Sequence, residues 1–171
     1  MADNRDMERR TIAEEIKSRP MPAEQAAVRH GLRTADLRTA EMRMLLKEHG
    51  ITRQQYNVLR ILRGAGPDGL PTLEVGTRMV TRVPDVTRLV DRMVAADLVR
   101  RTRSDTDRRV VRTTLTPKGI EIVDSLLQPV TELHRQQLLH LSEEELTELS
   151  RLLEKARARE ELPQSSDSEI N

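Results

Sequence analysis

The stretch from residue 84 to residue 115 decides the fold, and it reads PDVTRLVDRMVAADLVRRTRSDTDRRVVRTTL. Its first part carries apolar side chains at the i, i+3, i+4, i+7 spacing of one helix face: Val86, Leu89, Val90 and Met93. The pattern then changes, because residues 97–102 and 109–115 are typical of strands and the second run is rich in β-branched side chains. Polar residues 103–108 separate the two runs. The stretch therefore predicts a helix followed directly by a two-stranded β-hairpin.

A short helix is predicted just before this stretch, over residues 72–80, with a tight connection at residues 81–83. Pro84 suits the first turn of the next helix, because the N–H that proline lacks would be unpaired there. Two short helices joined by a tight turn form a helix-turn-helix. The hairpin that follows would be the wing of a winged helix-turn-helix.

Longer helices are predicted on the N-terminal side. Residues 23–48 carry apolar side chains at helical spacing. Thr52 and Gln55 form a capping box that begins the next helix, and the glycine-rich run 64–69 ends it. Leu70 is expected to lie in a short strand. Two helices and a brief strand are therefore predicted to precede the helix-turn-helix.

Two further helices are predicted after the hairpin. A cap and a first-turn proline at residues 116–117 begin the first, which runs to about His140. Pro129 lies inside it and is expected to bend it. Ser142 and Glu145 form a second capping box, which begins the last helix. The fold class is therefore mainly α with a small β-wing.

The composition limits the class of protein. The 171 residues suit one domain with extended helical ends. The chain has a single tyrosine and no Phe or Trp, so its core must be aliphatic. Burial of apolar surface shared between subunits would strengthen such a core. The absence of cysteine excludes disulfides, thiolate metal ligands and thiol redox sensing. No signal peptide or apolar run of about 18 residues is visible, so a cytoplasmic protein with no membrane partner is expected.

Charge is spread unevenly although the net charge is only +1. Residues 72–116 carry ten arginines against six acids, a balance of +4. Residues 141–171 carry four bases against nine acids, a balance of −5. The basic middle indicates a localised face for a polyanion, and solvated helix faces are the alternative interpretation.

Four stretches, in order, resemble the MarR family of bacterial multiple-antibiotic-resistance type regulators. They are ITRQQYNVL at 51–59, VTRLVDRM at 86–93, DTDRR at 105–109 and LTPKG at 115–119. Together with the flanking helices the resemblance spans about residues 23–160. The chain departs from the family pattern at Met93, where Leu is usual, and at residues 95–97, where a glycine commonly ends the helix.

The resemblance implies the same order of elements and a homodimer formed through the first and last helices. On this basis the chain divides into a charged arm over residues 1–22, a MarR-like domain over 23–162 and a disordered tail over 163–171. Within the domain, the DNA-binding lobe covers about residues 51–116. The dimerisation helices cover about residues 23–48 and 117–160.

The helix over residues 84–96 is predicted to enter the major groove of double-stranded DNA, which is wide enough for an α-helix. Its face opposite the apolar side presents Asp85, Thr87, Arg88, Asp91 and Arg92. Arg88 is the best candidate for a base contact, since arginine matches guanine O6 and N7 bidentately. Thr87 and Arg82 would contact phosphate or base edges. Arg92 would meet a phosphate or pair with Asp85, Asp91 or the wing, and Pro84 lies at the start of this surface.

The tip of the hairpin is the second predicted contact. The resemblance implies that Arg108 or Arg109 enters the minor groove while Asp107 orients it. A narrow minor groove concentrates negative potential, which favours an inserted guanidinium. Arg103 would add a phosphate contact. An ordinary charged hairpin tip is the alternative interpretation.

The resemblance also implies a cleft for a small aromatic or acidic effector, lined by the first, second and fifth helices. Candidate ligand-binding residues are His30, Arg33, Leu37, Tyr56 and Arg60. An arginine there would pair with a carboxylate. For each of these side chains, packing or solvent exposure is the alternative interpretation. The four histidines show no short ligand spacing, so neither a metal nor another cofactor is predicted.

The sequence therefore predicts a DNA-binding transcription regulator that a small molecule releases from a pseudo-palindromic operator. The resemblance implies a repressor, which is the default role in the family. The alternative is an architectural or silencing protein that coats DNA with low sequence specificity. A third reading is a dimerisation or adaptor module with a degenerate DNA face, against which the intact arginines argue. An enzyme is not predicted, because no nucleotide-binding glycine loop, nucleophile elbow or metalloprotease helix is found.

Overall fold

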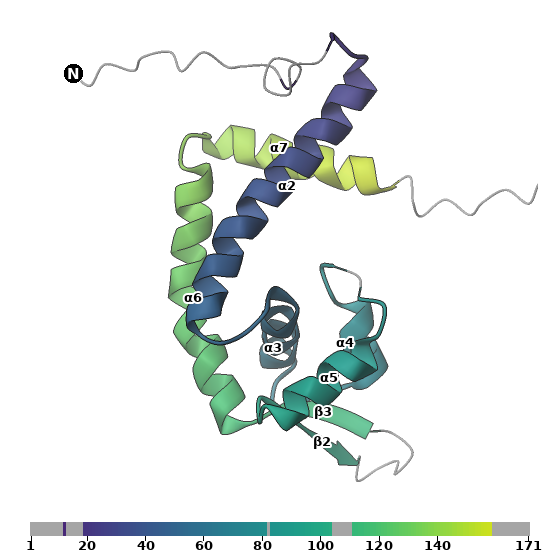
Figure 1. The fold of residues 1–171 in the computed structure, drawn as a ribbon, viewed down its shortest axis with the longest axis vertical. Coiled ribbons are helices and arrows are strands. Elements are labelled where there is room, and N and C mark those ends of the chain that lie inside the picture. Colours follow the sequence, from purple (N-terminus) through teal and green to yellow (C-terminus); the bar gives the residue numbers. More distant parts are fainter. Residues whose placement is uncertain (1–11, 13–18, 82, 104–110, 159–171) are drawn as a thin grey trace, which may run out of the picture. The chain divides into compact units, whose positions relative to one another are not determined.

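The structure is a computed structural model, and it describes residues 12, 19–81, 83–103 and 111–158 (Figure 1). The chain divides into two compact units, one up to Thr131 and one from Glu132 onwards, and each unit is described by itself. The elements follow the predicted order: α2 (Ala23–Glu48), α3 (Arg53–Ala65), β1 (Leu70–Pro71), α4 (Thr72–Thr77), α5 (Val86–Ala95), β2 (Val99–Arg103), β3 (Val111–Leu115), α6 (Pro117–Leu138) and α7 (Glu143–Arg157).

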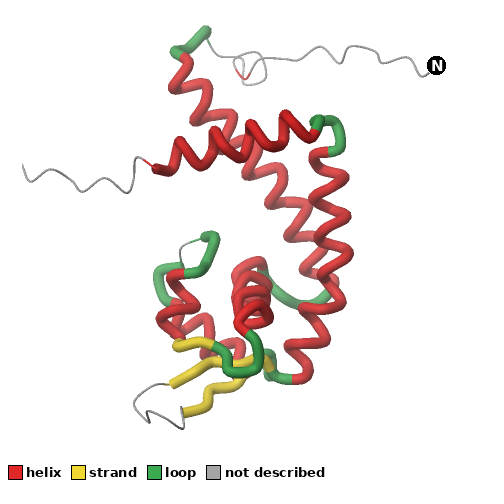
Figure 2. Tube along the Cα trace, turned by 180° about the vertical axis from the view of Figure 1, so that it is seen from behind, coloured by secondary structure: helices red, strands yellow, loops and turns green. Residues whose placement is uncertain are grey.

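The predicted fold class is confirmed, because helices dominate and the strands form one small sheet (Figure 2). The sheet is antiparallel, with strand order β1-β3-β2. Thr113 of β3 faces Arg101 of β2 on one side and Leu70 of β1 on the other. The strand expected at Leu70 therefore exists, and it completes the sheet beside the hairpin. The connection between β2 and β3 lies outside the described residues.

Local hydrogen bonds begin the helices where the sequence predicts. The Gln55 N–H donates to the Thr52 hydroxyl over 3.2 Å, and the Thr52 N–H donates to the Gln55 side chain over 2.8 Å. Ser142 and Glu145 make the same reciprocal pair at the start of α7. Both predicted capping boxes are confirmed, and each satisfies two amide donors that a helix start leaves unpaired.

The core lies in the first unit and is built from aliphatic side chains with one tyrosine, as the composition predicts. Leu59 and Val58 of α3, Leu46 of α2, Met93 of α5 and Leu126 of α6 are all buried completely. They belong to one cluster, to which α2 contributes side chains near its C-terminal end and α6 contributes side chains as far as Val130. This cluster holds α5 and the sheet in place, so truncating one of its leucines to alanine should cost about 2–5 kcal/mol.

Several predicted boundaries are wrong. The short helix α4 ends at Thr77 rather than at residue 80, because the chain turns where the Met79 N–H donates to the Gly76 carbonyl. Pro84 does not lie in the first turn of α5, since Asp85 caps that helix and Val86 begins it. A short polar side chain at this position is a stronger start signal than the proline before it.

Two other boundaries shift by two residues. The strand β2 begins at Val99 rather than at Asp97, because Asp97 turns the chain in the left-handed region at φ +56°. α6 ends at Leu138, two residues before the predicted end. The predicted start of the second hairpin strand, at residue 109, lies outside the described residues, and β3 is described from Val111. α6 continues as one helix through Pro129.

Candidate nucleic-acid interface

The helix α5 separates buried and exposed faces as its periodicity predicts. Leu89, Val90 and Met93 are buried in the core. Thr87, Arg88, Asp91 and Arg92 are exposed on the other side. The helix therefore presents two arginines and a threonine, with one carboxylate, to anything that approaches this face.

Asp85 has a structural task within this surface. Its carboxylate accepts a hydrogen bond from the Arg88 N–H over 2.8 Å and caps α5. A carboxylate at a helix N-terminus also complements the positive end of the helix dipole. Asp85 thus sets the position of Arg88, the residue predicted to read a base, while Pro84 lies exposed just before the cap.

The wing strand is tied to α5 by a residue that the sequence reasoning missed. The Arg101 guanidinium of β2 donates to the Asp91 carboxylate over 2.5 Å and to the Thr87 carbonyl over 3.4 Å. Asp91 is therefore paired with Arg101 of the wing strand. In the sequence, only the period-two alternation along β2 could have pointed to Arg101. That alternation does not distinguish Arg101 from Arg103, which lies two residues further on the same face of the strand.

Some arginines of the hairpin donate hydrogen bonds within the winged helix-turn-helix, whereas Arg103 is exposed. Arg112 donates to the carbonyls of Asp68 and Gly69 over 2.8 Å and 2.9 Å, so it anchors the loop before β1. Arg100 donates to the Thr114 hydroxyl across the strand pair over 3.2 Å. Arg103 is exposed at the last described position before the tip. It remains in reach of an external partner.

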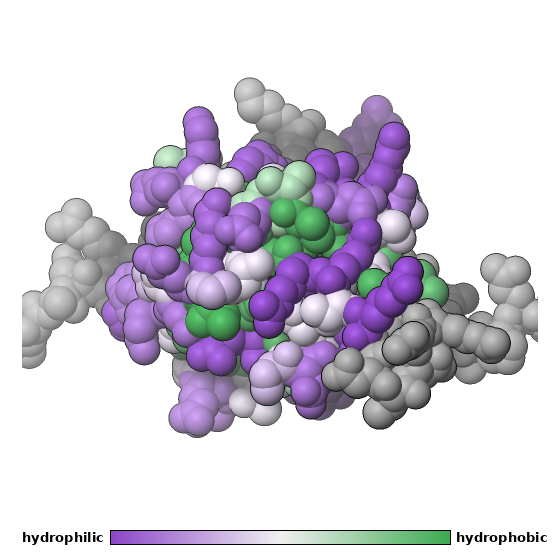
Figure 3. Space-filling view, turned by 90° about the horizontal axis from the view of Figure 1, so that it is seen from below, coloured by the Kyte–Doolittle hydropathy of each residue, from purple (hydrophilic) through white to green (hydrophobic). Residues whose placement is uncertain are grey.

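Four of the predicted DNA-binding residues lie outside the described residues: Arg82, Asp107, Arg108 and Arg109. Of the others, Pro84 and Asp85 precede α5, and Thr87, Arg88 and Arg92 lie on it. Arg103 ends β2, the strand that Arg101 ties to α5. Viewed from below, this end of the molecule shows hydrophilic side chains around a smaller apolar area (Figure 3). The exposed arginines of α5, together with Arg103, suit a phosphate backbone.

The turn that leads from α5 to β2 is held by the start of α6. The Thr116 hydroxyl donates to the Asp97 carbonyl over 2.7 Å and accepts from the Gly119 N–H over 3.0 Å. The Lys118 ammonium donates to the Ala96 carbonyl over 2.9 Å. The stretch at residues 115–119 thereby fixes the end of α5. The glycine that the family pattern has in this turn is replaced here by a residue in the left-handed conformation, Asp97.

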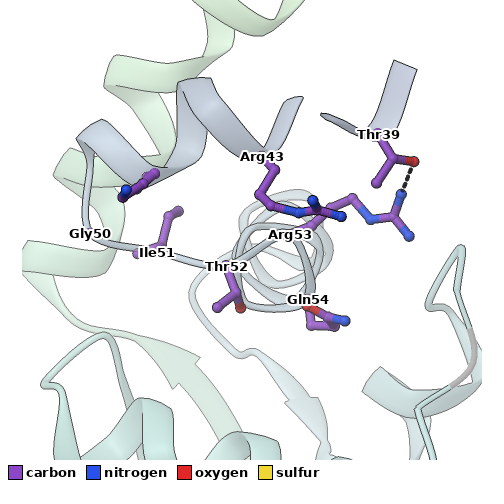
Figure 4. A pocket seen from close by; sticks show the side chains of 8 residues that line it. Thr39, Arg43, Gly50, Ile51, Thr52, Arg53 and Gln54 are labelled. Atoms are coloured by element: carbon purple, nitrogen blue, oxygen red, sulfur yellow. Dashed lines mark hydrogen bonds between the residues drawn. The ribbon is translucent and has the colours of Figure 1, made fainter. Parts of the chain in front are cut away.

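The residues predicted to hold an effector are only partly brought together. Tyr56 is buried, and the Arg60 guanidinium lies 3.5 Å from its hydroxyl. His30, Arg33 and Leu37 are exposed along α2. The structure instead has a pocket where α2 turns into α3, and it shares none of these residues (Figure 4). Its lining is Thr39, Arg43, Lys47, Gly50, Ile51, Thr52, Arg53 and Gln54.

The described residues contain neither a metal-ion cluster nor a membrane-spanning helix. No group of three or more His, Asp or Glu side chains there could hold a metal ion. No helix there is long and apolar enough to cross a membrane.

A helix-turn-helix with an exposed basic second helix, tied to a β-hairpin, defines a winged helix-turn-helix protein. A model of the MarR family matches residues 49–110. The HTH-type transcriptional repressor MdtR of Bacillus subtilis (strain 168) is 31% identical over 115 residues, which cover 67% of this chain and 73% of the relative. The chain belongs to the MarR family of DNA-binding transcription regulators.

Solved structures agree with this family. The structure of a MarR transcription factor from Planctomyces limnophilus is 40% identical with a TM-score of 0.60, covering 80% of this chain and 98% of that one. A mutant of MarR from E. coli complexed with operator DNA is 25% identical with a TM-score of 0.68, covering 85% of this chain and 97% of that one. The predicted family and its winged helix-turn-helix fold are therefore confirmed.

Proposed function

We propose that this chain is a sequence-specific transcription repressor that binds a pseudo-palindromic operator as a homodimer. One observation carries the proposal: α5 exposes Arg88 and Thr87 beside a wing strand that is tied to it through Arg101 and Asp91. An isolated basic helix would bind polyanions generally. A helix held in a set orientation next to a wing is suited to reading base edges.

Each residue of this surface has a proposed task. Arg88 contacts guanine in the major groove, and Thr87 contacts a phosphate or a base edge. Arg82, Arg92 and Arg103 contact phosphates and set the register of the protein on the duplex. Arg108 and Arg109 act at the minor groove with Asp107 behind them.

The homodimer is supported by apolar side chains that each unit exposes. Val28, Leu32 and Met44 of α2 are 62%, 68% and 72% exposed. Leu152 and Leu153 of α7 are each 48% exposed. Burying such side chains stabilises an association by roughly 25 cal/mol per Å² of apolar surface. We therefore assign dimerisation to residues 23–48 and 117–160 and DNA binding to residues 51–116.

Two-fold symmetry determines the form of the operator. Two recognition helices related by a dyad would reach half-sites about one helical turn apart, roughly 34–36 Å. A small-molecule effector would release the protein by favouring a dimer whose helices no longer match that spacing.

Fluorescence anisotropy of the purified chain with its own upstream intergenic DNA tests the proposal, with scrambled DNA of equal length as the control. A repressor of this kind should prefer the native fragment by at least about a thousandfold. Equal affinity for both fragments would favour the architectural alternative. Absence of binding to either at low salt would refute DNA binding itself.

A further inference from the structure

The pocket where α2 turns into α3 gathers positive charge, and we call it the cationic pocket. Arg43 and Lys47 lie one turn apart on α2, and Arg53 begins α3. The described residues that line the pocket include no aspartate or glutamate. Between described residues, none of the side-chain ion pairs involves these three cations. The cationic pocket therefore favours an anionic partner.

The walls of the pocket are open and polar. Arg43, Lys47, Thr52 and Gln54 are exposed, and Ile51 is the single apolar side chain among the described lining residues (Figure 4). Small-molecule sites enclose their ligand mainly between apolar and aromatic side chains. An exposed hollow with charged and polar groups is better suited to a phosphate that belongs to a strand of DNA lying across the surface.

Arg53 is held in place by neutral partners. One terminal nitrogen of its guanidinium donates to the Thr39 hydroxyl over 2.7 Å, and the other donates to the Thr81 hydroxyl over 3.3 Å. A guanidinium carries five N–H donors, and a hydroxyl does not neutralise its charge. Arg53 is therefore fixed in orientation and keeps both charge and donors for a phosphate oxygen.

The contact with Thr81 places the pocket next to the recognition helix. Thr81 lies in the connection between α4 and α5, four residues before the capping residue Asp85. In a helix-turn-helix the first residues of the recognition helix contact base edges, so the strand that borders the groove passes close to this connection. We propose that Arg43, Lys47 and Arg53 bind a backbone phosphate of operator DNA, in addition to the contacts of α5 and the wing.

This inference rests on the proposed function and adds a third contact to it. A phosphate is the same in every sequence, so the contact contributes affinity without reading bases. Because Arg53 is joined to the connection before α5, the bound phosphate also sets the register of α5 in the groove.

Anisotropy across salt concentrations tests the contact, with the native upstream fragment and scrambled DNA of equal length. Arg43→Gln should weaken binding to both fragments by the same factor, about fivefold or more at about 0.1 M salt. The slope of log affinity against log salt should fall by about 0.9 for each subunit, since each neutralised phosphate releases counterions.

Arg29→Gln is the matched control. It removes the same charge from an exposed position of α2 that lies roughly 21 Å along the helix from Arg43. Salt screens charges over about 10 Å at 0.1 M, so affinity and slope should stay at their wild-type values. Both variants should melt at the wild-type temperature, because both side chains are exposed.

Phosphate-ethylation interference on the native fragment locates the contact. Ethylation removes the charge of one phosphate and blocks a protein that binds there. With the wild-type chain, one interfering phosphate in each half-site should be lost in Arg43→Gln while the others persist. Arg29→Gln should give the wild-type pattern.

Several results would overturn the contact. Equal salt slopes for wild type and Arg43→Gln, or an unchanged interference pattern, would refute it and leave the proposed function intact. Loss of affinity for the native fragment alone would also refute it, because the pocket would then act on base reading. Calorimetric binding of inorganic phosphate that Arg43→Gln abolishes, with DNA affinity unchanged, would assign the pocket to a free anion. Failure of the wild-type chain to bind either fragment would refute the proposed function itself.

Discussion

Arg101 of β2 donates to the Asp91 carboxylate of α5 over 2.5 Å, which ties the wing strand to the recognition helix. The pair neutralises the one carboxylate on the exposed stretch of α5 between Thr87 and Arg92. Without Arg101, that carboxylate would face the phosphates of DNA unpaired. We therefore expect the ion pair to affect DNA binding more than stability, because exposed ion pairs contribute about 0–1 kcal/mol to folding.

Arg101→Ala should weaken operator binding about tenfold or more, while the free energy of unfolding changes by less than about 1 kcal/mol. Anisotropy and urea unfolding measure the two quantities. Adding Asp91→Asn to Arg101→Ala should recover part of the lost affinity, since the unpaired carboxylate is then removed. No recovery in the double variant would show that Arg101 acts through a direct phosphate contact.

Arg88→Ala and Arg108→Ala should affect DNA binding in different ways. Losing a bidentate guanine contact should cost about 1–3 kcal/mol at the matched site and relax preference at one base position. Losing Arg108 should weaken binding to many sequences alike and reduce the slope of log affinity against log salt by about 1. Binding to a randomised site library across salt concentrations separates the two effects, and identical profiles would refute both assignments.

Asp97 tests the backbone of the turn after α5. Its φ of +56° is a conformation that a β-branched residue adopts only with strain. Asp97→Val should therefore lower the free energy of unfolding by about 1–2 kcal/mol. Asp97→Gly should unfold at the same or a higher temperature than wild type. Thermal denaturation compares the two, and a wild-type melting temperature for Asp97→Val would contradict the strained turn.

Gly119 allows α6 to approach the turn at Leu98. A Cβ at position 119 would lie 2.0 Å from the Leu98 carbonyl oxygen, and backbone cannot yield as a flexible side chain can. Gly119→Ala should destabilise the protein by more than about 2 kcal/mol in urea unfolding. Gly64→Ala is the matched control, because nothing lies within 4 Å of its Cβ position in α3. That variant should gain up to about 1 kcal/mol.

Arg63 of α3 and Asp124 of α6 form a two-pronged ion pair, at 2.8 Å and 3.0 Å. The hydrogen bond from Arg63 lowers the pKa of Asp124 below its usual value. A lowered folded-state pKa stabilises the protein above the unfolded pKa of about 3.9, and this contribution is lost as the pH falls through the folded value. The melting temperature of wild type should exceed that of Asp124→Asn by a constant amount between pH 7 and 5.

That difference should shrink below pH 4, where Asp124 becomes protonated. Arg63→Gln should behave like Asp124→Asn, because either change removes the pair. A difference between wild type and Asp124→Asn that persists unchanged at pH 2 would contradict an ionic origin.

An interaction between residues close in the sequence can be predicted from the sequence, whereas an interaction between distant residues cannot. The sequence alone determined the bounds of α2, both capping boxes and the buried face of α5, because these depend on periodicity and on partners three or four residues apart. It also indicated the family, through four ordered stretches that resemble the family pattern. It placed the end of α4 and the start of α5 wrongly, where Gly76 and Asp85 act as local turn and cap. Competing signals within a few residues of one another explain those errors.

Only the tertiary structure decided which side chains meet across elements. Arg101 is separated from Asp91 by 10 residues, Arg53 from Thr81 by 28 and Arg63 from Asp124 by 61. Arginines are abundant along this chain, and periodicity places many of them on exposed faces without naming their partners. Partner choice depends on how the helices and strands pack around the shared core, so the tie between wing and recognition helix and the cationic pocket appear only once the chain is folded.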